Sequence, residues 1–225
     1  MRKKKPKKPL KKWQKILYDI LFLIALGVFI YSGYQLYHIY SQNHAEEKEK
    51  IELQQLSNIP DDLEKDFTVN WKALKKKNDE ILAWILIPDT NINYPIVKGS
   101  DNSWHKTMFT DIEKFKEKAF FDKHPYLYIF TPQQNYRCEI FSIHSAKDLS
   151  ASYDLNYPTK ESWQQYLNMV EGLSNFKRNV KLNTQDHIVT LSTCSYEEGN
   201  STDLRYLLHA KLVKWDGSYK VKKGK

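Results

Sequence analysis

A cysteine and an arginine in the C-terminal part of the chain have the spacing of a small reaction centre. Cys194 ends the apolar, β-branched run that begins at Ile188, and Arg205 opens a second apolar run eleven residues later. A thiol attacks a carbonyl as the thiolate, and a neighbouring guanidinium favours that anion and can hold a developing oxyanion. If the runs are adjacent strands joined by the loop 195–202, the two side chains face each other. Asp203, just before Arg205, is either an acid that tunes the arginine or a surface residue at a loop end.

The elements that must position this pair alternate between short strands and single helices. Apolar runs bounded by turn residues predict strands, and amphipathic spacing predicts helices. The expected strands are 81–87, 92–97, 126–130, 136–144, 188–193 and 205–215, and the expected helices are 67–77, 111–121 and 159–172. Strands outnumber helices and are joined mostly by turns or by one helix. This order favours a mixed, mainly β fold, a β-barrel with helices inserted between its strands.

The first forty residues predict a membrane anchor. Residues 1–12 contain eight lysines or arginines and no acid, and without them the chain has 27 basic and 27 acidic residues. The positive charge therefore belongs to a tail and not to a nucleic-acid-binding face. Residues 16–40 are apolar enough to span a bilayer, and the basic flank predicts a cytoplasmic N-terminus with the remainder outside the cell. A cleaved signal peptide is the alternative, but no small-x-small cleavage site follows the apolar centre.

The composition divides the chain further. We expect a basic cytoplasmic tail at 1–15, a transmembrane helix at 16–40, a helical stalk at 41–66, a catalytic domain at 67–217 and a basic tail at 218–225. Two cysteines make no disulfide framework, and Cys138 alternates like a half-buried strand residue. No cluster of His, Cys, Asp or Glu has the spacing of metal ligands, so the sequence gives no reason to expect a metal.

Several motifs in combination resemble the sortase family, and class B in particular. Residues 190–194 read Thr-Leu-Ser-Thr-Cys and match the family's Thr-Leu-x-Thr-Cys signature, and Arg205 lies where the family has its essential arginine. The strand region 78–97, the Phe-Phe-Asp-Lys-His-Pro segment 120–125 and the long helix before the cysteine strand are also similar to class B. So is the single N-terminal anchor. The resemblance covers roughly residues 50–215.

This resemblance implies a membrane-anchored cysteine transpeptidase at the outer face of a Gram-positive cell. In such an enzyme Cys194 attacks the carbonyl after Thr in an Asn-Pro-x-Thr-Asn-like C-terminal sorting signal of a surface protein or pilin. The thioester then passes to an amine of the peptidoglycan cross-bridge or of a pilin. Arg205 stabilises the oxyanion or aligns the substrate backbone, and a histidine protonates the departing amine. The expected partners include the lipid bilayer, through residues 16–40, but no nucleic acid, and the scheme needs no metal or cofactor.

The histidine is where the chain departs from the family's pattern. In the family it follows two further strands after the Tyr-Pro strand, whereas here nine residues, 96–104, separate Pro95 from His105. Strands average about five or six residues, so two strands and their turns do not fit this interval. We therefore expect that an internal segment of a few dozen residues is missing. His105 is the candidate catalytic acid, a surface role for His105 is the alternative, and His144 is an outside candidate.

Three functions are compatible with these residues. The first is an active class B-like transpeptidase with a shortened barrel. The second is a non-catalytic, membrane-anchored binding module that keeps a substrate groove, and the third is a cysteine endopeptidase that hydrolyses the same bond. Because missing strands expose sheet edges and remove core surface, we also expect a less stable fold than that of complete relatives.

Overall fold

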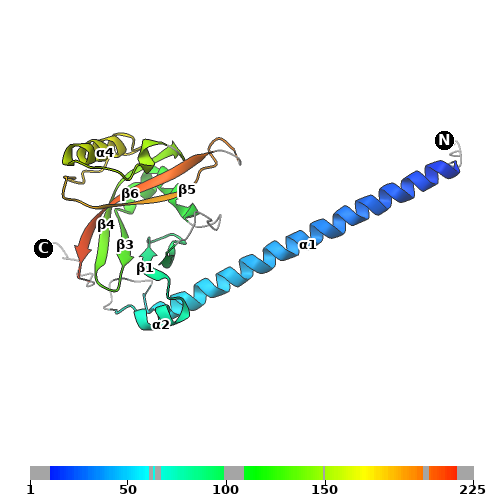
Figure 1. Cartoon of the computed structure of the whole chain (residues 1–225), viewed down its shortest axis with the longest axis horizontal. Helices are drawn as coiled ribbons and strands as arrows, with labels where there is room; N and C mark the ends of the chain where they lie inside the picture. Colours follow the sequence, from blue (N-terminus) through cyan, green and yellow to red (C-terminus); the bar gives the residue numbers. More distant parts are fainter. Residues whose placement is uncertain are drawn as a thin grey trace, which may run out of the picture. The chain divides into compact units, whose positions relative to one another are not determined.

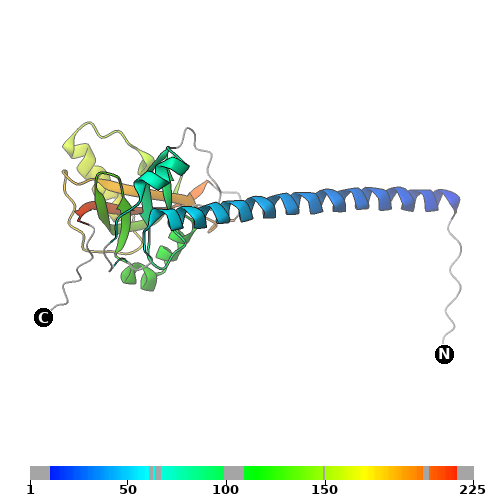
Figure 2. The ribbon, with the colours of Figure 1, turned by 90° about the horizontal axis from the view of Figure 1, so that it is seen from below.

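The computed structural model describes residues 11–60, 63, 67–98, 109–148, 150–199 and 203–216. The chain divides into two compact units, Met1–Ile51 and Glu52–Lys225. Most of the first unit is helix α1 (Lys12–Ser57), which is continuous over 46 residues (Figures 1 and 2). Its N-terminal part is long and apolar enough to cross a membrane by length and composition. The segment predicted as a helical stalk begins as the later part of the same helix, which ends before Asn58, a residue with a left-handed φ of 59°.

The second unit is built on one antiparallel sheet. Its strands are β1 (Ile81–Leu86), β2 (Asn93–Val97), β3 (Tyr126–Phe130), β4 (Asn135–Lys147), β5 (Ile188–Cys194) and β6 (Leu204–Trp215). They lie in the order β2-β1-β3-β4-β6-β5, and every neighbouring pair is antiparallel. The sheet curls into a half-barrel in which the long strands β4 and β6 lie side by side (Figure 1). The prediction of a mixed, mainly β fold is confirmed.

Short helices precede the first strand or connect later strands. They are α2 (Trp71–Lys77), η1 (Thr110–Lys116), α3 (Lys118–Lys123), η2 (Ala151–Tyr153) and α4 (Lys160–Gly172), of which η1 and η2 are 3₁₀ helices. Helix α4 follows its prediction closely because Thr159 caps it: the Thr159 hydroxyl accepts from Ser162 N, and Ser162 Oγ accepts from Thr159 N. Helix α2 begins later than predicted, at the Asn70 cap, whose side chain accepts from Ala73 N.

The prediction of one continuous helix over 111–121 is wrong. The structure breaks it into η1 and α3 at Glu117, whose backbone is extended, with φ of −91° and ψ of 122°. Phe115 and Phe121 are both completely buried. Six residues apart, they would point to different sides of a single α-helix, since each residue turns the helix by about 100°. The break lets both rings reach the core.

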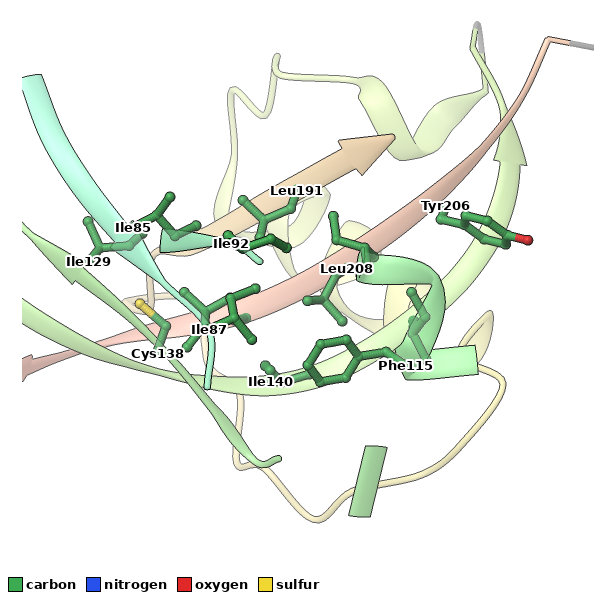
Figure 3. Close-up of a cluster of buried hydrophobic side chains, with 14 of the residues drawn as sticks. Ile85, Ile87, Ile92, Phe115, Ile129, Cys138, Ile140, Leu191, Tyr206 and Leu208 are labelled. Atoms are coloured by element: carbon green, nitrogen blue, oxygen red, sulfur yellow. The ribbon is translucent and has the colours of Figure 1, made fainter. Parts of the chain in front are cut away.

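The main core lies on one face of the curled sheet (Figure 3). In this close-up, Leu191 of β5 and Leu208 of β6 lie near Ile85 of β1 and Ile92, which precedes β2. Successive side chains of a strand point to opposite faces. Because Leu191 points into the core, Cys194 points to the other face of β5, on which Ile188 contacts the smaller cluster around α4. The apolar pattern of β5 therefore decides on which face its cysteine lies.

Candidate functional site

Strands β5 and β6 place Cys194 and Arg205 opposite each other. The two are directly paired in the antiparallel ladder. Directly paired residues project from the same face, with Cβ atoms about 4.5–5.5 Å apart. Ser195 N donates a hydrogen bond to Leu204 O at 2.9 Å, so the pairing continues past Cys194. Cys194 is a half-buried free thiol and Arg205 is also half-buried, an arrangement that lets a ligand reach both groups.

A tyrosine from η2 lies on the same face as Cys194. The hydroxyl groups of Tyr153 and Ser192 are 2.6 Å apart, and Ser192 has the same orientation in β5 as Cys194. Burial raises the pKa of Tyr153, so this hydroxyl stays neutral at physiological pH. Tyr153 could not be predicted as a site residue from the sequence, because it lies in an irregular segment whose distance from β5 cannot be read from local patterns.

The end of β4 holds the Arg205 side chain. Arg205 Nη2 donates to Asp148 Oδ2 at 2.9 Å, and Nη1 donates to Leu204 O at 3.0 Å. The ladder explains this contact, since Ala146 is paired with Arg205 and β4 ends next to it. Asp203, the acid that the sequence suggested, instead lies 4.0 Å from Lys147 Nζ. The acid beside the arginine thus comes from a distant part of the sequence.

The loop after Cys194 is attached to the rest of the domain by a carboxylate. Glu197 Oε2 accepts from Ser145 Oγ at 2.7 Å, and Glu197 Oε1 lies 3.2 Å from Lys116 Nζ. Burial works to raise the pKa of Glu197, but the bonds from Ser145 and Lys116 outweigh it and lower that pKa. These contacts connect η1, β4 and the loop, and so restrain the chain that follows the thiol.

Of the two candidates for the catalytic histidine, the structure describes only His144. His105 lies outside the described residues. His144 is buried, and its ring nitrogens lie 3.4 Å from Ser142 Oγ and 3.1 Å from Ser152 Oγ. Its ring stacks on His209 with centroids 5.1 Å apart. Burial lowers the pKa of His144 to about 4, so it is neutral at physiological pH and poorly suited to protonate a leaving amine.

Other polar groups of the domain serve the fold. His124 connects α3 to the turn after β1, since its Nε2 lies 2.8 Å from Asp89 Oδ2 and its Nδ1 lies 3.0 Å from Phe120 O.

Within the described ranges, no group of three His, Cys, Asp or Glu side chains could hold a metal ion. A cavity between α2 and the β3–β4 turn is lined by residues that include Trp71 and Trp215, but by none of the candidate residues.

Known proteins with the same fold resemble this chain over most of its length. No protein-family profile matches it. Sortase B of Listeria monocytogenes is 26% identical over 86% of this chain and 95% of its own length, and sortase B of Staphylococcus aureus is 20% identical over 87% and 96%. The structure of Clostridium perfringens sortase B superimposes with a TM-score of 0.58 at 27% identity, covering 64% of this chain and 99% of that one. The chain is a class B sortase-like protein. Sortase B of Bacillus anthracis in complex with AAEK1 matches with a TM-score of 0.65 at 25% identity, over 78% of this chain and all of that one.

The alignments with the two sortase B relatives contain positions that this chain does not fill. The Listeria alignment extends over 250 positions, but 86% of 225 residues is only about 194 residues, so about 56 positions hold residues of the relative alone. For the Staphylococcus protein, 235 positions against about 196 residues leave about 39. Each alignment therefore leaves a few dozen positions without a counterpart in this chain, and the internal deletion before His105 stays a prediction.

Proposed function

We propose that this sortase-like chain is an active cysteine transpeptidase that cleaves an Asn-Pro-x-Thr-Asn-like sorting signal after Thr and transfers it to a cell-wall or pilin amine. The observation that carries the proposal is the direct pairing of Cys194 with Arg205 across β5 and β6. A half-buried thiol next to a guanidinium is the arrangement needed to attack a peptide carbonyl and hold the resulting negative charge. The similarity to sortase B proteins supports the same reaction class.

The reaction has two steps in this scheme. The Cys194 thiolate forms a bond to the carbonyl carbon, and the Arg205 guanidinium stabilises the oxyanion of the tetrahedral intermediate. The bond from carbon to nitrogen then breaks, and we assign to His105 the proton that the departing amine takes up. An acceptor amine attacks the thioester, loses a proton to the same histidine, and releases the thiolate. The modified protein ends with a new amide bond.

We further propose that residues 16–40 anchor the enzyme in the membrane with the N-terminus in the cytoplasm. The length and apolar composition of α1 support an anchor, and the basic residues before it support the orientation. In this arrangement the domain at 67–217 is extracellular, where the sorting signals of surface proteins or pilins and cell-wall amines are available. The segment 41–66 then serves as the stalk.

The experiment that tests the proposal uses the full chain in detergent. An Asn-Pro-x-Thr-Asn peptide is added with and without triglycine, and intact-protein and product masses are measured. We expect a thioester on Cys194 and, with triglycine, a ligated product. Hydrolysed peptide without ligation would favour the endopeptidase, and peptide binding without a thioester would favour the binding module. Either result would contradict the transpeptidase assignment.

A substitution tests the role of His105 separately. His105→Ala is expected to lower the rate of acylation by at least about 100-fold, because general acid catalysis contributes about 10²–10⁴-fold. The matched control is His187→Ala, since His187 is exposed and precedes the opposite end of β5 from Cys194. Acylation at the wild-type rate in the His105 variant would instead make His105 a surface residue. Single-turnover kinetics followed by intact mass measure the difference.

A further inference from the structure

Only one oxygen of the Asp148 carboxylate, at the end of β4, has a hydrogen-bond partner among the described residues. Asp148 Oδ2 lies 2.9 Å from Arg205 Nη2, whereas Asp148 Oδ1 is covered from solvent and has no hydrogen-bond partner among the atoms that the structure describes. A covered carboxylate oxygen without a donor is unfavourable, because the oxygen loses its hydration and gains nothing in return. The fold therefore places a carboxylate beside Arg205 that uses only one of its oxygens in the contact.

The backbone fixes where this charge lies. Asp148 N donates to Asp203 O at 3.0 Å, which extends the β4–β6 ladder beyond the paired residues Lys147 and Leu204. Arg205 Nη1 is bound to Leu204 O at the same end of the ladder. The Asp148 carboxylate and the Leu204 carbonyl thus restrain the long Arg205 side chain. Without them, conformational entropy would be lost when the reaction selects one rotamer of Arg205.

The order of the strands shows from which side Asp148 restrains the Arg205 side chain. Strand β6 lies between β4 and β5, so Asp148 contacts Arg205 from the β4 side while Cys194 is its neighbour on the β5 side. We propose that Asp148 is a positioning residue that holds the Arg205 guanidinium back from the thiol and leaves the space between them for the substrate carbonyl. The inference rests on the transpeptidase function proposed above. A guanidinium already placed at the far side of the carbonyl can bind the oxyanion without reorganising.

This role predicts two opposite changes in one variant. In Asp148→Ala, acylation by the sorting peptide is expected to slow about tenfold at saturating peptide with KM nearly unchanged, because Asp148 acts on the guanidinium and not on the peptide. Alkylation of Cys194 by iodoacetamide is expected to become at least threefold faster, because the released cation can approach the thiolate. Asp148→Asn should recover most of the acylation, since its amide oxygen can accept the same hydrogen bond.

Controls separate positioning from a general loss of structure. Asp203→Ala removes the neighbouring acid, whose side chain lies near Lys147, and should leave both rates within about twofold of wild type. In an Arg205→Ala background, Asp148→Ala should change neither rate by more than about twofold. The inference is overturned if Asp148→Ala leaves both rates unchanged, or if its effects persist without Arg205. The alkylation rates need no peptide, so they test Asp148 even if the wild-type chain forms no thioester, a result that would count against the proposed function itself.

Discussion

Cys194→Ala is expected to reduce peptide cleavage and thioester formation to background, whereas Cys138→Ala should leave turnover within about twofold of wild type. The two thiols differ in what surrounds them. Cys194 is half-buried at the end of β5, next to Arg205. Cys138 is completely buried in the main core, and burial raises its pKa to about 12, so it remains an unreactive thiol at neutral pH. Removing the only nucleophile of the proposed reaction leaves no route to a thioester.

Continuous fluorescence of a quenched sorting peptide and the intact mass of the protein measure this effect. Circular dichroism of both variants verifies that each is folded, which matters because Cys138→Ala leaves a small cavity in the core. The assignment fails if Cys194→Ala still forms a covalent adduct with the peptide. Loss of turnover in Cys138→Ala with an unchanged melting temperature would also count against it, because a core residue acts on catalysis only through the fold.

The pairing at the centre of the site could be predicted because its signals are local. The apolar, β-branched run that begins at Ile188 predicts the strand, and the sequence distance to Arg205 is short enough for one loop to return the chain beside it. The register then follows, because a shift by one residue would turn Leu191 out of the core and Cys194 into it. These steps use neighbouring residues and one close connection. None of these signals depends on the rest of the sheet.

The acid beside the arginine could not be predicted in the same way. Asp148 is 57 residues from Arg205 in the sequence, and its contact depends on β4 and β6 being neighbours in a register that no local pattern sets. Asp203 was the nearer acid in the sequence, but its side chain lies beside Lys147. Tyr153 was missed for the same reason. The helix over 111–121 was wrong because amphipathic spacing does not show which two rings must reach the core together.

The second large effect concerns stability in acid. The rings of His144 and His209 stack inside the domain and are almost completely buried. Burial and, to a smaller extent, the nearby Lys116 charge lower the pKa of His144 to about 4. Burial and, to a smaller extent, the His144 ring lower the pKa of His209 to about 3. Both histidines are therefore neutral in the folded protein at neutral pH. An unfolded histidine has a pKa of about 6.5.

The sign of the pH dependence follows from these values. Below about pH 6.5 the unfolded chain binds protons that the folded chain does not, so stability falls as the pH falls and is restored as the pH rises. Lowering the pH from neutral to 5 is expected to reduce the free energy of unfolding by about 2 kcal/mol for each histidine, since one pKa unit corresponds to about 1.4 kcal/mol. Two such losses are a large part of the 5–15 kcal/mol that is typical of a domain.

Urea unfolding of the full chain at pH 7.5, 6 and 5 measures this loss, in a range where most carboxylates remain ionised. His209→Phe should remove about half of the dependence, because a phenyl ring fits among the neighbouring aromatic rings of Phe141 and Tyr166 and cannot be protonated. His187→Gln is the control, since His187 is exposed and its loss should leave the dependence unchanged. Equal pH dependence in His209→Phe and in the wild-type chain would show that the buried pair does not set acid stability. His144 is bonded to Ser152, next to Tyr153, so unfolding at low pH also disrupts η2 beside the thiol. Activity at pH 5 should therefore decline together with stability, and less steeply in His209→Phe.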